Sequence, residues 1–394
     1  MKVTFVLPWT GLQGGIRVIA THAQHLAQRG HAVHVVSMPQ TFTAKQTLKS
    51  LLRGAGWPHP EPSYFDGLTL THRVLDRARP VTDDDVPEAD VVIATYYTTA
   101  RGVLALSPAK GAKAIFIQGY EVDPGQRIPA MEASWRMPMH KIVISHGLRE
   151  RALDQFGDSL VSHVPNSVDT ALFHAPKRGK QPLPTVGLLY STVRTKGCRV
   201  SMAALERIAA ALPGLRVISF GAEPVSWRLP LPAGAEFHLR PAQHSLRELY
   251  AQCDIWLCGS YAEGFHLPPL EAMACRCPVV STRVGGPLDT VEEGANGHLV
   301  AVGDAQALAD RALRVLALSQ SDWAAMSDAA HATATRYTWD DANHRFEQAM
   351  ELAIERQRRG DFAPRQQATI PLLSVGKRFE TGLARTHNTE ESSP

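Results

Sequence analysis

The first half of the chain alternates short apolar runs with segments whose apolar residues recur at helical spacing. Residues 2–7 form an apolar run short enough to be a buried strand, and residues 31–37 alternate as a second strand does. Between them Ile19 and Ala23 share one face of a predicted helix, and Gly30 is placed to stop it. This strand–helix–strand opening predicts a parallel, doubly wound sheet. Similar runs predict further strands at residues 91–94, 114–117 and 141–145.

The second half repeats this pattern after a stretch rich in Pro, Gly and Lys at residues 174–184, which indicates a linker. A helix is predicted at residues 304–318 with Asp304 as its cap, and a last helix at residues 340–358. From residue 360 onward Pro, Thr, Ser and Glu accumulate without periodicity, which predicts a flexible tail over residues 360–394. Strands are predicted at residues 185–190, 216–221, 236–239, 254–258 and 279–282.

The length of 394 residues allows two domains, each with its own core. We predict a first domain over residues 1–170 and a second over residues 171–339. A formal charge of +3 is too weak to indicate binding to nucleic acid. Residues 1–8 are too short for a signal-peptide core, and no run is long enough to span a membrane. These features predict a cytoplasmic protein.

The chain has five cysteines, an odd number that indicates reduced thiols and a cytosolic setting. Because four of them lie close together in the sequence, a zinc site is one alternative. No pair has the C-x2-C spacing, and the four lie in or beside apolar segments, which favours buried packing roles. These four are Cys253, Cys258, Cys275 and Cys277.

Residues 254–282 predict a strand, a loop, a helix and a second strand. Pro268 and Pro269 suit the opening of the helix, where a missing N–H costs nothing. The loop that contains Glu263 and Gly264 then lies at a helix N-terminus, whose unpaired amides and positive dipole end favour phosphate. Gly264 lets a bulky anion approach the backbone. We therefore predict a phosphate seat in this loop.

Two carboxylates flank the predicted phosphate seat: Glu263 in the loop and Glu271 in the helix, with seven residues between them. A carboxylate repels phosphate, but it accepts hydrogen bonds from sugar hydroxyls. Two of them on either side of a phosphate seat suit a molecule with a sugar at each end and a diphosphate between, which is a nucleotide-sugar. For Glu271 alone, a favourable charge near the helix N-terminus is an alternative explanation.

The string EGFHLPPLEAMA resembles the Glu-x7-Glu signature of the retaining GT-B glycosyltransferases of family 4. The resemblance implies that Glu263 holds hydroxyls of the transferred sugar and that Glu271 holds the nucleotide ribose. The family usually has Gly where His266 stands, so the seat is expected to be narrower or to gain a hydrogen-bond donor. The other predicted nucleotide-sugar contacts in this loop are Gly264, Phe265, His266 and Leu267.

In family 4 an Arg and a Lys that follow the first strand of the second domain clamp the donor diphosphate. Lys196 and Gly197 match the Lys-Gly pair, whereas Ser191 occupies the usual Arg position. Arg194 is predicted to take over from the missing Arg. Cations at this place would neutralise the charge that grows on the leaving diphosphate. A surface loop with two basic residues is the alternative.

Two further motifs in the first half carry the resemblance. Gly14 and Gly15 follow the first strand, as a Gly-Gly pair often does in family 4 close to the donor phosphates and the acceptor, although a tight turn would explain them equally. Gln118-Gly-Tyr-Glu121 stands where many members have a His-Asp pair near the transferred sugar. This variant looks more like a subgroup that includes rhamnosyltransferases, and a polar turn is the alternative. Residues 164–173 resemble the family's Pro-Asn-Gly-Val-Asp segment at the domain junction.

Two polar segments outside these motifs were candidates for other contacts. Lys45, Lys49 and Arg53 lie among apolar residues in the segment 43–57, which predicts either a plain surface helix or a basic amphipathic surface that meets a membrane or lipid-linked acceptor. Residues 83–85 (Asp-Asp-Asp) have the D-x-D spacing that a different glycosyltransferase fold uses for metal. They lie in a polar connection, so a solvated loop without metal is predicted.

The resemblance covers nearly the whole chain before the tail and is strongest at residues 185–300. It implies a GT-B fold, with two facing Rossmann-like doubly wound domains and a C-terminal crossover helix at residues 340–358. The implied reaction moves a sugar, with retention of anomeric configuration, from a nucleotide-sugar to a glycan or lipid-linked acceptor in cell-surface polysaccharide or glycolipid synthesis. No metal or other cofactor is expected. The alternatives are a sugar-nucleotide epimerase or hydrolase on the same fold, and an inactive scaffold subunit.

Overall fold

In the computed structural model the described residues are organised around two parallel sheets. The predicted tail from residue 363 onward lies outside the residues that the structure describes, as do Glu121 of the strand-end motif and three cations of the segment 43–57, namely Lys45, Lys49 and Arg53. The described residues are 1–40, 42, 47–48, 51–52, 56–57, 62–120 and 128–362.

In the first half, the described residues form a seven-stranded parallel sheet in the order β3-β2-β1-β4-β5-β6-β7. β1 lies between β2 and β4, with Val3 opposite both Val33 and Val91. This order, in which the chain starts in the middle and winds outward in both directions, is that of a doubly wound sheet. The strands are β1 Lys2–Leu7, β2 Ala32–Ser37, β3 Thr71–Val74, β4 Val91–Ala94, β5 Ala112–Ile117, β6 His140–Val143 and β7 Ser162–His163.

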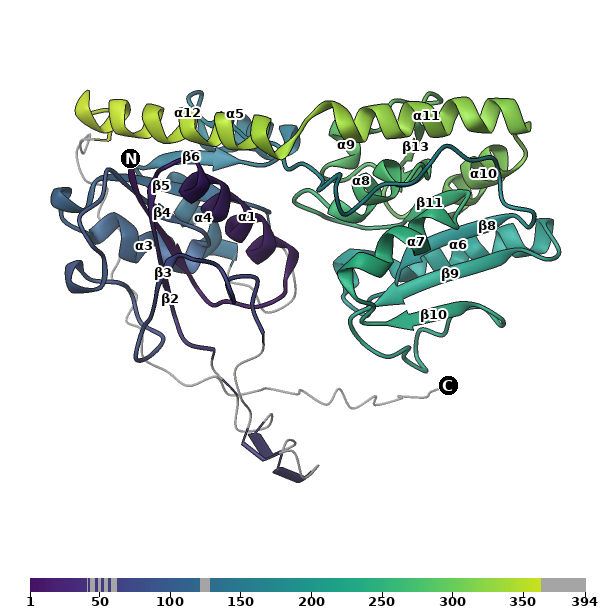
Figure 1. Cartoon of the computed structure of the whole chain (residues 1–394), viewed down its shortest axis with the longest axis horizontal. Coiled ribbons are helices and arrows are strands. Elements are labelled where there is room, and N and C mark those ends of the chain that lie inside the picture. Colours follow the sequence, from purple (N-terminus) through teal and green to yellow (C-terminus); the bar gives the residue numbers. More distant parts are fainter. Residues whose placement is uncertain are drawn as a thin grey trace, which may run out of the picture. The chain divides into compact units, whose positions relative to one another are not determined.

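The helices of the first half connect these parallel strands, as a crossover requires (Figure 1). Helix α1 begins at Gly14 directly after the loop that follows β1, which places its N-terminus at the carboxyl end of the sheet. Its buried face carries Ile16, Ile19 and Ala23 at helical spacing. The helices are α1 Gly14–Gln28, α3 Tyr97–Ala105, α4 Ile128–Arg136 and α5 His146–Phe156, with 3-10 turns η1 Asp83–Asp85 and η2 Pro108–Lys110.

The second half forms a six-stranded parallel sheet in the order β10-β9-β8-β11-β12-β13, the same winding as in the first half. Its central pair joins β8 to β11, with Gly187 opposite Trp256. The strand order in each half and the parallel pairing confirm the predicted architecture of two α/β domains. The strands are β8 Thr185–Leu189, β9 Arg216–Gly221, β10 Glu236–Leu239, β11 Ile255–Cys258, β12 Val279–Thr282 and β13 Gly297–Val300.

Helices of the second half pack in pairs, α6 with α10 and α8 with α11. The predicted cap at Asp304 is confirmed, because its Oδ1 accepts a hydrogen bond from the Ala307 amide at 2.8 Å. The helical elements are η3 Arg194–Lys196, α6 Cys198–Ala211, η4 Gln243–Ser245, α7 Leu246–Ala251, α8 Leu267–Ala274, α9 Pro287–Thr290, α10 Ala305–Leu316, α11 Gln320–Arg336 and α12 Trp339–Arg358.

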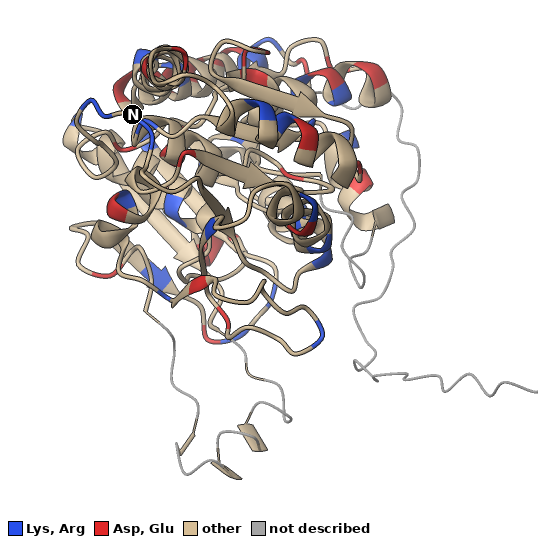
Figure 2. Cartoon of the chain, turned by 90° about the vertical axis from the view of Figure 1, so that its right-hand side faces the viewer, with Lys and Arg blue, Asp and Glu red and all other residues tan. Residues whose placement is uncertain are grey.

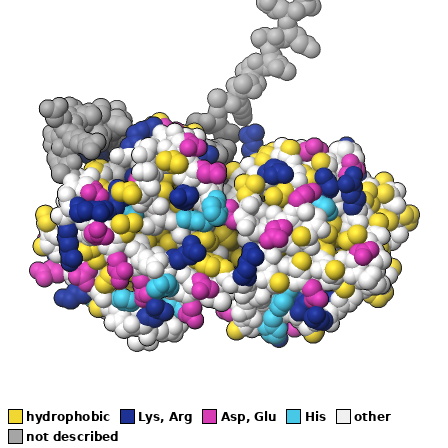
Figure 3. Space-filling model, turned by 90° about the horizontal axis from the view of Figure 1, so that it is seen from above, with side chains coloured by type: hydrophobic (Ala, Val, Ile, Leu, Met, Phe, Trp, Pro, Cys, Tyr) yellow, Lys and Arg dark blue, Asp and Glu magenta, His cyan; other side chains and the backbone are white. Residues whose placement is uncertain are grey.

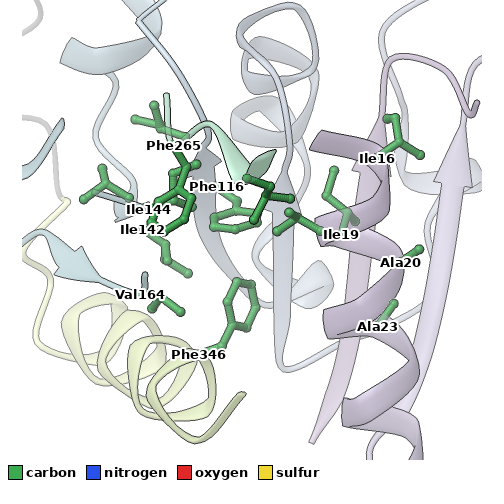
Figure 4. Close-up of a cluster of buried hydrophobic side chains, with 14 of the residues drawn as sticks. Ile16, Ile19, Ala20, Ala23, Phe116, Ile142, Ile144, Val164, Phe265 and Phe346 are labelled. Atoms are coloured by element: carbon green, nitrogen blue, oxygen red, sulfur yellow. The ribbon is translucent and has the colours of Figure 1, made fainter. Parts of the chain in front are cut away.

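Helix α12 is the predicted crossover helix. It follows α11, which packs on α8 in the second half, yet α12 contacts β5, β6 and α1 of the first half. Its Phe346 ring meets Phe116 of β5 edge-on at 5.2 Å between centroids. Figure 4 shows Phe346 pointing between Phe116 and the apolar face of α1. Residues far apart in the sequence therefore build the core of the first half.

Charged side chains are mixed in sign over the surface. Figure 2 shows Lys and Arg interspersed with Asp and Glu over the described elements, and Figure 3 shows the same mixture on the face of α11 and α12. No helix in the described part of the chain is both long and apolar enough to cross a bilayer. In the segment 43–57, for which the sequence predicts either a plain surface helix or a membrane-contact surface, four described apolar side chains are exposed, namely Leu48, Leu51, Leu52 and Trp57.

The prediction of a solvated loop at residues 83–85 is wrong for Asp85. This carboxylate is buried, and it accepts two hydrogen bonds from the Arg79 guanidinium at 2.5 and 2.9 Å. It also caps the turn η1, because its Oδ2 accepts from the Thr82 amide at 2.9 Å. The Arg79 hydrogen bonds hold the pKa of Asp85 below its usual range although burial alone would raise it. Asp85 is therefore a structural residue of this turn.

Candidate active site

A cavity of about 510 Å³ collects side chains from both sheets at their carboxyl ends. The structure brings ten of the eleven predicted site residues to its wall, whereas Arg194 is exposed and is not part of the lining. The ten are Gly14, Gly15, Gln118, Lys196, Glu263, Gly264, Phe265, His266, Leu267 and Glu271.

Glu263 lies in the loop between β11 and α8, with its side chain 7% exposed. Its two carboxylate oxygens accept hydrogen bonds from the Lys196 ammonium at 3.0 and 2.8 Å, and one of them also accepts from the Ser260 hydroxyl at 2.9 Å. Burial by itself raises the pKa of Glu263, but the charges of His266 and Lys196 outweigh it and lower this pKa to about 2. The carboxylate is therefore ionised and can accept hydrogen bonds from a ligand.

His266 adopts a left-handed backbone conformation, with φ 73°, at the N-cap of α8. Glycine takes this conformation without strain, which explains why a Gly suits this position in the family. The imidazole is buried, and its Nδ1 lies 3.0 Å from Glu263 Oε1 as an ion pair without hydrogen-bond alignment. Burial lowers the pKa of His266, but Cys258 and Glu263 beside it raise this pKa by a larger amount. His266 therefore adds a positive charge behind Glu263.

Gly264 brings the second half into contact with the first. A Cβ built at this position would lie 1.7 Å from the carbonyl oxygen of Gln118 and 3.0 Å from the Cα of Gly119. Both are backbone atoms of the first half, so they cannot turn aside as a flexible side chain would. Glycine is therefore required here by close approach of the two backbones.

We expect Gly264→Ala to lower kcat/KM by about a hundredfold, because a misplacement of about 1 Å at the reacting centre has an effect of that size. The thermal midpoint should change little, because the added methyl group would lie between the two halves and not inside either hydrophobic core. Gly147→Ala is the matched control, because a Cβ there meets nothing within 4 Å. Comparable kcat/KM values for the Gly264→Ala and Gly147→Ala variants would contradict the close approach.

Glu271 lies in α8 with its side chain 5% exposed. Oε1 accepts a hydrogen bond from the Arg17 guanidinium at 2.5 Å, and Oε2 accepts from the Tyr250 hydroxyl at 2.8 Å. Arg17 belongs to α1 of the first half, and its other terminal nitrogen donates to Gln243 Oε1 at 3.0 Å. Both oxygens of Glu271 are therefore in use, one of them on a partner from the other sheet.

Lys196 ends the short turn η3, directly before Gly197. Gly197 takes a left-handed conformation with φ 57°, and a Cβ there would lie 1.8 Å from the carbonyl oxygen of Gly259. This close packing fixes the loop and aims Lys196 at Glu263. Arg194 opens the same turn but is exposed, so the structure gives no support to its predicted role on the diphosphate.

Gly14 and Gly15 open α1 and line the cavity. The Arg17 amide makes the first helical hydrogen bond, to the Gln13 carbonyl at 3.0 Å, so the preceding amides have no partner within the helix. The Gln118 side-chain amide donates to the Gly15 carbonyl at 3.1 Å. A second helix N-terminus therefore faces the cavity opposite that of α8.

A second pocket of about 400 Å³ lies in the first half and shares Gly15, Gln118 and Gly119 with the main cavity. Aromatic side chains contribute much of its wall, among them Trp9 and Tyr96, whose rings meet edge-on at 5.5 Å. None of the described residues that line this pocket carries a charge. It therefore suits an uncharged part of a ligand.

The five cysteines are all free and buried, as the sequence predicts. Burial raises the pKa of Cys253 and Cys277 above the ordinary range, which is typical of packing cysteines. Among the described residues one group could hold a metal by geometry: His146, His163 and Asp289 place potential ligand atoms within 4.8 Å of one another. None of these three lines the main cavity.

Comparison with known proteins agrees with this geometry. Residues 182–318 match the family Glycosyl transferases group 1. The chain is 43% identical over 74 residues to N-acetyl-alpha-D-glucosaminyl L-malate synthase of Bacillus anthracis, 19% of each chain. It is 33% identical over 192 residues to D-inositol 3-phosphate glycosyltransferase of Mycobacterium tuberculosis (strain F11), 43% of this chain and 38% of that one. The chain thus matches well under two thirds of these relatives' length.

The structure of HepE from Anabaena in complex with UDP and glucose superposes with a TM-score of 0.66, at 17% identity, over 89% of this chain and all of HepE. At this identity the likeness shows the fold, which is GT-B. The chain has the GT-B fold, and its residues 182–318 resemble the glycosyl transferases of group 1.

Two residues of this site were not predicted from the sequence, namely Arg17 and Tyr250. Arg17 follows the Gly14–Gly15 pair by two positions in the first turn of a helix, and this place close to a predicted phosphate contact was the signal that could have marked it. Tyr250 lies in α7 beside buried leucines, and no pattern in the sequence distinguishes it from an ordinary core residue. Both were identified only through their hydrogen bonds to Glu271.

Proposed function

We propose that this protein transfers a sugar from a nucleotide-sugar donor to a hydroxyl of an acceptor, with retention of the anomeric configuration. One observation carries the proposal: Glu263 and Glu271, two buried carboxylates, line one cavity together with Lys196 and two helix N-termini. This set has acceptors for sugar hydroxyls at two places and donors for a diphosphate between them. The UDP and glucose in the HepE complex support the same class of ligand.

In this proposal each group has a separate task. Glu271 accepts hydrogen bonds from the sugar of the nucleoside, and Glu263 accepts them from the sugar to be transferred. Lys196 and the amides at the start of α8 neutralise the charge that grows on the leaving diphosphate. Retention follows the family resemblance, in which an oxygen of the donor's own diphosphate takes the proton of the acceptor hydroxyl on the same face.

The acceptor is assigned to the second pocket, because it adjoins the main cavity at Gly15 and Gln118. Its aromatic, uncharged wall favours an acceptor whose bound end is neutral, such as a glycan unit or the sugar of a lipid-linked glycan. Contact with a membrane through the segment 43–57 remains a prediction. Both acceptor classes are consistent with a role in cell-surface polysaccharide or glycolipid synthesis.

A panel of UDP, GDP, dTDP and ADP in a thermal-shift experiment tests the donor site. A nucleoside diphosphate that binds the folded protein should raise the thermal midpoint with its concentration, by mass action. The variant Gln118-Gly-Tyr-Glu121 favours dTDP-rhamnose, so dTDP is expected to give the largest shift. A larger shift with UDP or GDP would refute that donor, and no shift with any of the four would argue against the proposed function.

Transfer should not require a divalent metal, since the proposed charge stabilisers are Lys196 and backbone amides. We expect the initial rate in excess EDTA, which removes metal from an open site, to equal the rate without it. The measurement is product formation from the donor that the thermal-shift panel identifies. Loss of transfer in EDTA that Mg²⁺ or Mn²⁺ restores would show a metal step, and the group of His146, His163 and Asp289 would be the first place to examine.

A further inference from the structure

Two ion pairs join the permanently charged side chains of the cavity, and His266 adds a further positive group beside Glu263. Its described lining has two permanently positive side chains, Arg17 and Lys196, and two carboxylates, Glu263 and Glu271. Arg17 is paired with Glu271, and Lys196 is paired with Glu263. A nucleotide-sugar carries hydroxyls that suit the carboxylates and a diphosphate that suits the cations. Such a ligand therefore competes with both ion pairs, because its hydroxyls and its phosphates offer each charged group a new partner.

We propose that Arg17 binds the donor diphosphate, and that it reaches the phosphates by leaving Glu271 when the nucleoside sugar takes its place. This inference rests on the proposed function, since it assigns a further residue to the same donor site.

The hydrogen bonds of Glu271 indicate which partner is exchanged. Tyr250 is fully buried between the second sheet and α8, where its ring packs on Trp256 at 4.6 Å, so its hydroxyl is held in place. Arg17 comes from the other half and keeps 22% of its side chain exposed. A sugar hydroxyl can therefore replace Arg17 on Oε1 while the Tyr250 hydroxyl stays on Oε2.

The position of Arg17 on α1 indicates where the guanidinium goes. Gly14 and Gly15 lie three and two residues before it, in the first turn of the helix, and place the unpaired amides of α1 at the cavity wall. A diphosphate at this N-terminus lies within reach of a side chain from the same turn. Guanidinium matches phosphate oxygens with two parallel hydrogen bonds, whereas a lysine offers a single point charge.

The residue that usually supplies a second cation for the donor diphosphate in family 4 is replaced in this chain. Ser191 stands where family 4 usually has the phosphate-clamping Arg, and the nearby Arg194 is exposed and does not line the cavity. Without Arg17, Lys196 would be the one permanently positive side chain of the described lining to face the two or more negative charges of a nucleoside diphosphate. Arg17 supplies the second cation from the opposite half, so one ligand would hold both halves together.

The test compares a nucleoside with its own diphosphate, using the pair that gives the largest thermal shift in the panel. In the wild type the nucleoside must displace Arg17 without offering it a new partner, whereas the diphosphate offers one. Arg17→Gln should therefore weaken diphosphate binding on the order of ten- to a hundredfold, the scale of a hydrogen bond to a charged group. It should leave nucleoside binding unchanged or make it tighter. Isothermal titration measures both dissociation constants.

Two further variants complete the experiment. Arg101→Gln removes an exposed arginine of α3 in the same half, and it should change neither constant, which controls for net charge. Arg17→Lys keeps one positive charge, so it should retain more of the preference for diphosphate than Arg17→Gln and carries the test if the glutamine variant does not fold.

Three results would overturn the proposal. Equal weakening of nucleoside and diphosphate in Arg17→Gln would show that Arg17 only braces Glu271, and unchanged diphosphate binding would show that it stays there. If Arg17→Lys loses the preference for diphosphate as fully as Arg17→Gln does, the positive charge of Arg17 does not cause that preference. A wild type that binds neither ligand would refute the proposed function itself, which separates that failure from failure of the Arg17 assignment.

Discussion

Lys196→Ala should lower kcat/KM by a factor on the order of 100 to 1,000, the scale for removal of one charge stabiliser from a transition state. Lys196 is the cation of the second half that lines the cavity, and its loop is fixed by the close contact of Gly197 with the Gly259 carbonyl. The charge on the diphosphate is largest when its bond to the sugar breaks. Most of the loss should therefore appear in kcat.

The ion pair with Glu263 adds a second consequence. Without Lys196, Glu263 loses two of its hydrogen bonds, and its pKa should rise from the low value that Lys196 and His266 maintain. Lys196→Arg is the matched variant, since it keeps the charge, and it should recover part of the activity. Arg194→Ala, which removes an exposed charge two residues away, should leave kcat/KM within about twofold, as is usual for surface positions. A larger loss in Arg194→Ala than in Lys196→Ala would reverse the two assignments.

Substitution of Glu271 and substitution of Glu263 should have different effects on binding and on kcat. The sugar of the nucleoside does not change during transfer, so bonds from Glu271 are nearly uniform between ground state and transition state. Its removal should mainly weaken binding, which raises the donor KM and the dissociation constant of the nucleoside diphosphate. A lost charged hydrogen bond has a free energy of about 1.5–3 kcal/mol, so an effect of roughly ten- to a hundredfold is expected for Glu271→Ala.

Glu263 is assigned to the transferred sugar, whose ring gains positive charge as its bond to the diphosphate breaks. A carboxylate beside it helps more in the transition state, so Glu263→Ala should depress kcat, on the order of 100-fold or more, while nucleoside diphosphate still binds. Titration of each variant with the nucleoside diphosphate alone separates the two cases. If Glu263→Ala abolishes this binding and Glu271→Ala leaves it intact, the roles are reversed.

Removal of Glu263 also leaves two positive groups, Lys196 and His266, without the carboxylate between them. Glu263→Gln keeps the shape and removes only the charge, so it controls for a cavity left by the alanine. Unfolding of the Gln variant at the wild-type midpoint would show that any loss of kcat has its origin in the site. A midpoint lowered in proportion to the loss of kcat would instead assign Glu263 a structural role.

Local pattern in the sequence was enough to predict most of the strands and some of the helices, because alternation, helical spacing and caps depend on neighbours along the chain. Residues 2–7 and 279–282 agree with β1 and β12, and the cap at Asp304 was placed correctly. The segment β3 Thr71–Val74 was missed, since its exposed edge lacks an apolar pattern. The short string from Glu263 to Glu271 also predicted the candidate site, because its residues share one loop and one helix.

Contacts between distant residues were decided by the tertiary structure alone. Arg17 and Glu271 are 254 residues apart, and nothing local to either one specifies their hydrogen bond. The same reason explains why Asp85 looked solvated and why Arg17 and Tyr250 were not predicted as partners of Glu271. The sequence by itself determined which segments form many of the strands and helices and the loop that precedes α8, through interactions within a few residues. Only the packing of the two sheets decided which charges face one another across the cavity, because electrostatic and hydrogen-bond partners are set by distance in space.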